Sequence, residues 1–167
     1  MDSLLIRPAR MNDIDGIREV AVETWNSTYE TIYPELFIAT FLNHAYAKSS
    51  LEQSIAQDET SKTRKFLVAE WEQEIVGFGQ LSEPENGVSE LTRLYILKEH
   101  QRKGIGKQLL EELIRMNPSL VEIYAWCERE NGIGTLFYQS NGFAYTEEKE
   151  EVLFDTRTNM SKYVKKI

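Results

Sequence analysis

The spacing of apolar side chains divides the chain into a helical part and a part dominated by strands. A short apolar run at 4–7 ends at Pro8 and predicts a first strand. Between 12 and 58, apolar residues recur at every third or fourth position, the spacing of one helix face. Asn12 stands where a helix cap is expected. We therefore predict two helices here, the first capped by Asn12 and the second around Pro34. The first has these residues on one face: Ile14, Ile17, Val20, Ala21 and Trp25.

The pattern changes to strands from residue 65 onward. The segments "KFLVAEW" (65–71) and "EIVGFGQL" (74–81) are separated by a short polar turn and predict a hairpin. The segment "SELTRLYIL" (89–97) follows the turn signal Asn86-Gly87 and adds a third antiparallel strand. The expected remainder is a helix ending before Pro118, a strand at 120–127, a helix at 131–140 ended by Gly142, and strands at 143–149 and 151–164.

This order predicts an α/β (α+β) fold built on one mixed sheet. The strand–helix–strand unit across 89–127 requires a parallel crossover, whereas the preceding meander is antiparallel. We find no repeat or linker, so we expect a single domain over 1–167. The strand at 151–164 is expected to form an exposed sheet edge, which would allow a homodimer.

The composition of the chain limits the kinds of ligand and partner that it is expected to bind. The net charge of -8 argues against a nucleic-acid ligand, because phosphate neutralisation needs clustered Lys and Arg. Cys127 is the only cysteine and there are two histidines, so we expect neither a disulfide nor a metal. No apolar run approaches the ~20 residues of a membrane span, and the N-terminus lacks the apolar core of a signal peptide. We expect a cytoplasmic protein with no membrane partner.

The loop "QRKGIG" (101–106) is the first candidate for chemistry. Glycines at the start of a helix expose unpaired backbone N–H groups, and the helix dipole adds positive charge, so the loop suits an anion such as phosphate. The alternative is a solvated basic loop whose glycines only make a tight turn. The basic residues around it are Lys98, His100, Arg102, Lys103 and Lys107. The loop is no Walker A sequence, and the dinucleotide fingerprint would need a third glycine at Leu109.

Two motifs resemble those of the GNAT family, the Gcn5-related N-acetyltransferases. The first is the pyrophosphate-binding pattern Q/R-x-x-G-x-G/A, spelled Gln101-Arg102-Lys103-Gly104-Ile105-Gly106. The second is N-x-x-A-x-x-F/L-Y-x-x-x-G-F, spelled Asn131-x-x-Gly134-x-x-Phe137-Tyr138 and then Asn141-Gly142-Phe143, with glycine in place of alanine at 134. The resemblance covers nearly the whole chain. Trp25, Thr28 and Tyr29 also resemble a W-x-x-T-Y segment of a bacterial subset that includes PaiA-like polyamine acetyltransferases.

The resemblance implies a GNAT fold: a twisted, mostly antiparallel sheet of six to seven strands with about four flanking helices. A bulge in the strand at 89–97 would separate it from the parallel strand at 120–127, and acetyl-CoA would lie in the gap. The implied cofactor partners are backbone groups of Leu94, Tyr95 and Ile96, then Gln101, Arg102, Lys103, Gly104, Ile105, Gly106, Lys107, Asn131 and Tyr138.

The resemblance also implies catalytic roles. Tyr138 would be the general acid for the leaving thiolate; the alternative is a buried tyrosine that only packs. Glu90 lies eleven residues before Gln101, the spacing of the catalytic glutamate in histone-acetylating members, and shares strand parity with Leu94 and Ile96. Glu83 is the reserve base, and ordered water is the alternative to both. Cys127, near the expected sulfur, is interpreted as a small buried residue rather than a nucleophile.

On the acceptor side, the fold would place Trp25, Tyr29 and Tyr33 near an amine, where aromatic faces attract cations. The alternative is core packing of the first helix. The favoured function is transfer of acetyl from acetyl-CoA to a small amine or polyamine by direct attack. Alternatives are a protein N-terminus or lysine as acceptor, a non-catalytic acyl-CoA-binding module, and a different phosphate ligand on the same loop.

Overall fold

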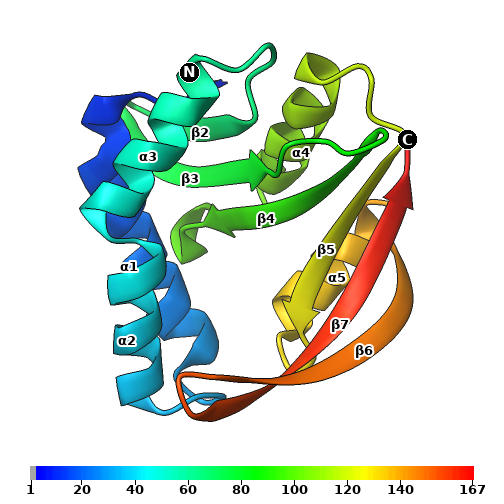
Figure 1. Ribbon diagram of the computed structural model, residues 1–167. Coiled ribbons are helices and arrows are strands. Elements are labelled where there is room, and N and C mark those ends of the chain that lie inside the picture. The colour runs from blue at the N-terminus through cyan, green and yellow to red at the C-terminus, as the bar shows by residue number, and fades with distance from the viewer. Residues whose placement is uncertain (1–2) are drawn as a thin grey trace.

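A seven-stranded sheet organises the molecule, with strand order β1-β2-β3-β4-β5-β7-β6 (Figure 1). The computed structural model describes residues 3–167. The strands are β1 (Leu4–Pro8), β2 (Phe66–Trp71), β3 (Glu74–Leu81), β4 (Val88–Ile96), β5 (Glu122–Glu128), β6 (Ala144–Leu153) and β7 (Thr156–Lys166). The helices are α1 (Ile14–Tyr29), α2 (Glu35–Ala45), α3 (Lys48–Glu59), α4 (Ile105–Met116) and α5 (Gly132–Ser140), with short 3-10 turns at Met11–Asp13 and Lys98–His100. Every strand pair is antiparallel except β4–β5, which confirms the predicted mixed sheet.

The N-terminal helices differ from the prediction in number and in cap. Three helices, not two, occupy residues 14–59, because α2 ends at Ala45 and α3 restarts at Lys48. The cap at Asn12 was wrong. Instead the carboxylate of Asp13 accepts the N–H of Arg10 at 2.8 Å and forms a bidentate pair with Arg7 at 2.8 and 2.9 Å. This ion pair ties the start of α1 to β1.

The sheet is covered on both faces, and β2 shows how the sequence achieves this. Phe66 and Val68 pack in the core under α1, α2 and α3, whereas Leu67 and Ala69 pack in the core under α4. All four side chains are fully buried. Burial of each large apolar side chain contributes about 1.5–3 kcal/mol, so this strand anchors both layers. Figure 1 shows α1, α2 and α3 on one side of the sheet and α4 and α5 on the other.

Strands β4 and β5 separate soon after they meet. Only Val88–Glu90 pairs with β5, at Glu122–Tyr124, and the two strands then diverge (Figure 1). The register of β4 against β3 shifts at the same point: Gln80 pairs with Arg93 but Leu81 pairs with Leu91, which leaves Thr92 as an extra residue. A bulge of this kind bends its strand. The predicted splayed pair and its bulge are therefore confirmed.

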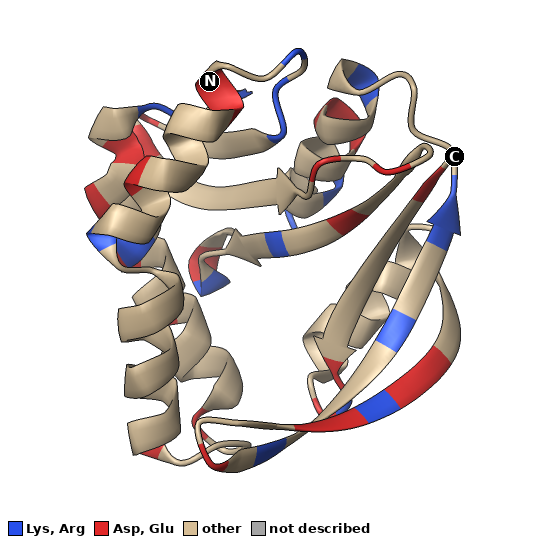
Figure 2. Ribbon diagram, in the orientation of Figure 1, with Lys and Arg blue, Asp and Glu red and all other residues tan. Residues whose placement is uncertain are grey.

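The last hairpin corrects the predicted edge. Its turn lies at Phe154 and Asp155, both with positive φ (48° and 59°), so β6 extends further than predicted and β7 begins later than predicted, at Thr156. Strand β7 lies between β5 and β6, so the edge strand at this end of the sheet is β6 rather than 151–164. The edge strand has five consecutive charged residues, Glu147–Glu151 (Figure 2). Charged edges oppose strand pairing between molecules, so the reason given for a homodimer was wrong.

In the part of the chain that is described, no helix combines the length and the apolar character needed to span a bilayer.

Candidate active site

The glycine loop presents a row of free backbone donors. Gly104 caps α4 with a left-handed φ of 80°, and Arg102 also has a positive φ of 62°. Within residues 3–167, the peptide N–H groups of 102–107 have no hydrogen-bond acceptor, whereas the next one, Gln108, bonds to the carbonyl of Gly104 at 3.0 Å. Successive free N–H groups at a helix N-terminus form an anion site. The loop therefore has the geometry that a pyrophosphate requires.

The two glycines of the loop serve different needs. Gly104 is needed for its backbone angle, since nothing crowds a side chain there. Gly106 is needed for space, because a Cβ at this position would lie 3.0 Å from the ring of Phe137. Gly106 thus allows the first turn of α4 to approach α5, so the loop and the second motif form one surface.

The side chains of the loop are mostly engaged elsewhere. Nε2 of Gln101 donates to the carbonyl of Ile96 at 2.9 Å and so ties the loop to the end of β4. The ammonium of Lys103 lies 5.3 Å from the ring of Trp71, and Lys107 pairs with Glu111 at 3.9 Å. Anion binding at this loop therefore depends chiefly on the backbone.

Fewer backbone N–H and C=O groups of β4 are free to bind a ligand in the gap than was predicted. Leu97 donates its N–H to Val76 in β3 at 2.9 Å, and backbone groups alternate in direction along a strand. By this alternation the peptide groups of Tyr95 face β3, and those of Leu94 and Ile96 face the gap. The Ile96 carbonyl is already bonded to Gln101. The expectation that all three residues are open to a ligand was therefore too broad, and Leu94 is the residue with the freest backbone.

Tyr138 lies where the strands part. It is held on α5, whose cap is Asn131: the side-chain oxygen of Asn131 accepts the N–H of Gly134 at 3.0 Å. The ring of Tyr138 packs 5.1 Å from Phe143 and 5.6 Å from Tyr163. Burial raises the pKa of Tyr138 well above its ordinary value, and negative charge on Cys127, Tyr95 and Glu90 would raise it further. The phenol therefore stays protonated and can donate a hydrogen bond or a proton.

The side chain of Cys127 is buried close to Tyr138, and its position explains why residue 134 is a glycine. Its side chain is 5% exposed, and burial raises the pKa of the thiol to about 11, so it remains neutral. A Cβ at Gly134 would lie 2.8 Å from its sulfur. The departure from alanine in the second motif thus makes room for Cys127. A buried neutral thiol agrees with the packing interpretation of Cys127.

The bulge at Thr92 places Glu90 on a different face from the one predicted. Leu91, Leu94 and Ile96 contact the core under α4, whereas Tyr95 contacts the core under α1. An extra residue shifts the alternation by one, so Glu90 does not share a face with Leu94 and Ile96. It lies instead on the α1 side of the sheet. Burial raises the pKa of Glu90, and the positive charges of Lys149 and Lys162 oppose that rise.

Glu83, the reserve base, is not brought to this site. Its side chain is 76% exposed, and it pairs with Lys65 at 3.2 Å. Lys65 also bonds to Ser61 and to the carbonyl of Thr63, in the segment before β2. Glu83 therefore belongs to a surface ion pair, and Glu90 is the only one of the two predicted bases that lies near Tyr138.

The three residues predicted to lie near the acceptor amine have different surroundings. Trp25 stacks on Phe41 at 4.0 Å and is 7% exposed, yet its indole N–H has no acceptor within residues 3–167. Tyr29 is equally buried, and burial raises its pKa, as would negative charge on Tyr95, Cys127 and Tyr138. Tyr29 therefore reaches toward the gap from α1. Tyr33 follows α1 in the turn before α2 and donates its hydroxyl to Glu128.

Glu128 is a site residue that the sequence did not reveal. It ends β5, and only 4% of it is exposed. The segment "CERE" (127–130) contains two glutamates, and nothing in the pattern distinguishes the buried one from the exposed one. Only the register of β5 shows that Glu128 follows Tyr124 and Trp126 on one face of the strand.

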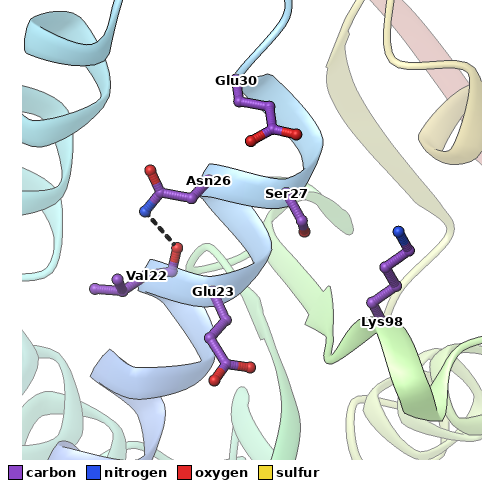
Figure 3. A pocket seen from close by; sticks show the side chains of 6 residues that line it. All are labelled: Val22, Glu23, Asn26, Ser27, Glu30 and Lys98. Atoms are coloured by element: carbon purple, nitrogen blue, oxygen red, sulfur yellow. Dashed lines mark hydrogen bonds between the residues drawn. The ribbon is translucent and has the colours of Figure 1, made fainter.

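A pocket of about 460 Å³ lies along α1 beside the residue that leads into the glycine loop (Figure 3). Its lining residues are Val22, Glu23, Asn26, Ser27, Glu30 and Lys98. Figure 3 shows Glu23, Ser27 and Glu30 on the side of α1 that looks toward Lys98, while Val22 and Asn26 point away. None of the predicted site residues lines this pocket. The pocket has two carboxylates, Glu23 and Glu30, on its α1 side.

The chain matches known proteins over most of its length. Residues 26–164 match the model of the acetyltransferase (GNAT) domain. The chain is 34% identical over 143 residues to a spermidine N(1)-acetyltransferase of Thermoplasma acidophilum, covering 84% of this chain and 88% of that protein. It is 29% identical over 152 residues to the uncharacterised N-acetyltransferase YuaI of Bacillus subtilis, covering 86% and 80%.

A solved structure agrees with these matches. The crystal structure of the PaiA N-acetyltransferase of Thermoplasma acidophilum in complex with coenzyme A superimposes with a TM-score of 0.83 at 32% identity, covering 99% of each chain. The predicted family, fold and enzyme class are thereby confirmed. The chain therefore belongs to the GNAT family of N-acetyltransferases.

Proposed function

We propose that this enzyme transfers the acetyl group of acetyl-CoA to a primary amine of a small polyamine, by direct attack in a ternary complex. The observation that carries the proposal is the junction of three features at one place: free N–H groups at 102–107, an open strand edge at Leu94, and the neutral phenol of Tyr138. The names of the relatives support it, since one is a spermidine acetyltransferase and the other was solved with coenzyme A.

The chain's own groups fit acetyl-CoA in two ways. The N–H groups of 102–107 suit the pyrophosphate, and a Cβ at Gly106 would crowd the surface that carries them. Leu94 offers backbone groups on the gap side, where an amide-containing arm can bond as an added strand does. Asn131, which caps α5 on the other side, is a further partner in this proposal. When bound, acetyl-CoA supplies the thioester whose carbon–sulfur bond breaks as the new amide bond forms.

Two proton movements fall to this chain's residues. An alkylamine with a pKa near ~10.4 is mostly protonated at neutral pH and must lose a proton to attack. Glu90, whose pKa burial raises, accepts that proton directly or through water. Tyr138 donates a hydrogen bond or its proton to the departing sulfur, which would otherwise leave as a thiolate. Glu90 and Tyr138 thus act on opposite reactants.

The acceptor side supports a cationic substrate. Tyr29 at the end of α1 and Tyr33 in the following turn lie on this side, and Glu23 and Glu30 line a pocket along α1. Aromatic faces and carboxylates both attract ammonium groups.

The test is an acetyl-CoA-dependent assay of thiol release, with products identified by mass. The acceptor panel contains diamines, triamines, amino acids, and peptides with a free N-terminus or lysine. We expect turnover with the polyamines and little with peptides. Turnover with peptides alone would replace the proposed acceptor. Tight coenzyme A binding without turnover on any amine would instead indicate a binding module.

A further inference from the structure

Glu128 is the only strongly buried carboxylate of residues 3–167 that lacks a cationic partner. The two others are Asp13, paired with Arg7 at 2.8 Å, and Asp58, paired with Arg64 at 2.9 Å. Glu128 takes part in none of the ion pairs of this range. Its oxygens accept only the hydroxyl of Tyr33 and the N–H of Glu130, the latter at 3.4 Å. A buried carboxylate without a cation is costly, so a missing positive charge is expected at this place.

The face of β5 that ends in Glu128 already binds ammonium groups of the chain itself. Tyr124, Trp126 and Glu128 alternate along this face. The ammonium of Lys162 lies 4.7 Å from the ring of Tyr124, and that of Lys149 lies 4.2 Å from the ring of Trp126. The rings of this face are thus placed to hold cations.

The two ends of this face differ in charge. At one end Glu90 pairs in register with Tyr124, and the charges of Lys149 and Lys162 act on its carboxylate. At the other end Glu128 has no such neighbour within ion-pair distance. An amine that arrives beside Glu90 therefore meets positive charge, which favours its neutral, reactive form. An ammonium group beside Glu128 meets uncompensated negative charge, which favours its protonated form.

The spacing of the two ends suits a linear polyamine. Tyr124 and Glu128 are four residues apart in a strand, or about 13 Å at ~3.3 Å per residue. An extended triamine of the length of spermidine spans about 11 Å between its terminal nitrogens, and the side chain of Glu128 can cover the remainder.

Resting on the polyamine function proposed above, we propose that Glu128, held by Tyr33, binds the distal ammonium group of the acceptor and so selects polyamines over monoamines by charge and length. Tyr33 fixes the carboxylate, since it keeps its proton: burial and the neighbouring Glu128 both raise the pKa of Tyr33 well above its ordinary value. Glu128 is thus a specificity-determining residue that does not touch the reacting atoms.

The test compares kcat/KM for butylamine, a diamine and spermidine in the wild-type enzyme and in Glu128→Gln. We expect the variant to lose ~10- to 100-fold in kcat/KM for spermidine through KM, and to keep its rate with butylamine, because only the contact of one charged group is lost. The matched control is Glu130→Gln, an exposed carboxylate two residues away, which should leave all three values unchanged.

Glu128→Asp keeps the charge and protects the test against misfolding of the glutamine variant. Because aspartate is shorter by one methylene, we expect it to recover activity with a longer diamine than the wild type prefers. An equal loss for monoamine and polyamine in Glu128→Gln, or no loss at all, would overturn the inference while leaving the polyamine function intact. A wild-type enzyme that acetylates no amine would overturn both.

Discussion

At the scale of single residues, burial near the gap raises the pKa of both Tyr138 and Glu90, and the proposed mechanism uses this one effect in two opposite ways. Both groups are harder to ionise than in water, because the charged form loses its hydration. For the phenol this means that the proton is kept, so that the hydroxyl is available to donate a hydrogen bond to the departing sulfur. For the carboxylate it means a stronger affinity for the proton of the incoming amine.

Replacement of Tyr138 by Phe should therefore lower kcat by ~100-fold or more, the usual contribution of a general acid, with little effect on acetyl-CoA affinity. Steady-state kinetics and calorimetric titration with acetyl-CoA would separate the two effects. Tyr145→Phe is the control, because Tyr145 is 53% exposed on β6. An unchanged kcat in Tyr138→Phe would remove this residue as the acid.

The raised pKa of Glu90 predicts the pH dependence of the reaction. The base must be ionised, so kcat/KM for the amine should rise with pH through a limb that lies above the ordinary glutamate value of ~4.3. Below this limb the logarithmic slope should steepen, since the amine must lose a proton as well. Glu90→Gln should abolish the steeper part, and Lys162→Met should move it to higher pH, because Lys162 lowers the pKa of Glu90.

Lys166→Met is the matched control for this profile, because Lys166 lies on the same strand but is 79% exposed and pairs with Glu122. A profile that is identical in the wild type and in Glu90→Gln would exclude Glu90 as the base and favour ordered water.

At the scale of elements, the site depends on two irregularities: the bulge in β4 and the left-handed cap of α4. The bulge ends the pairing of β4 with β5 after Glu90, and the cap leaves the N–H groups of 102–107 free. Both break a regular pattern, and both positions expose backbone groups that an ordinary strand or helix start would satisfy.

The sequence predicted the regular elements well, and some irregular ones through motifs. The hairpin of β2 and β3, the helix α4 and the gap all followed from patterns or from the resemblance. The turn at Phe154 and Asp155 did not, because it lacks the glycine that usually marks positive φ. The break between α2 and α3 was missed for a similar reason, since "HAYAKS" (44–49) contains neither Gly nor Pro.

Two errors at the site arose from features that the linear sequence does not show. A one-residue bulge moved Glu90 to the other face of the sheet, and strand parity counted through position 92 could not show this. Glu128 was missed because a lone buried carboxylate is defined by the absence of a nearby cation, which depends on elements far apart in the chain.

The cap of α4 predicts a difference between two glycines. Gly104→Ala should lower the free energy of unfolding by about 1–2 kcal/mol, because its φ of 80° strains a residue with a Cβ. Gly132→Ala should be neutral or slightly stabilising, because its φ is ordinary and no atom lies within 4 Å of an added Cβ. Urea unfolding of both variants would measure this, and equal losses would contradict the assignment of Gly104 to backbone conformation.

At the scale of the whole molecule, charge would act differently on the two proposed substrates, acetyl-CoA and a polyamine. The chain has a net charge of -8, yet the loop that suits an anion relies on backbone dipoles rather than on net charge. Figure 2 shows acidic residues distributed over the helices and over β6. A negative field of this kind attracts polycations over distances comparable with the Debye length.

We therefore expect kcat/KM for spermidine to fall as ionic strength rises, and that for butylamine to fall much less, because a monoamine carries a single charge. Assays from low to physiological salt at constant pH would measure both slopes. Equal slopes for the two amines would show that the field of the molecule contributes nothing to polyamine selection.

The short contact between β4 and β5 has a consequence for the order of events in a catalytic cycle. Only three residue pairs join β4, the strand that carries Glu90, to β5, the strand that ends at Glu128. If acetyl-CoA fills the gap as proposed, it would contact both strands and fix their separation, and with it the distance between Glu90 and Glu128. We expect ordered addition, with acetyl-CoA entering first and free coenzyme A leaving last. Product-inhibition patterns competitive only between acetyl-CoA and coenzyme A would establish that order.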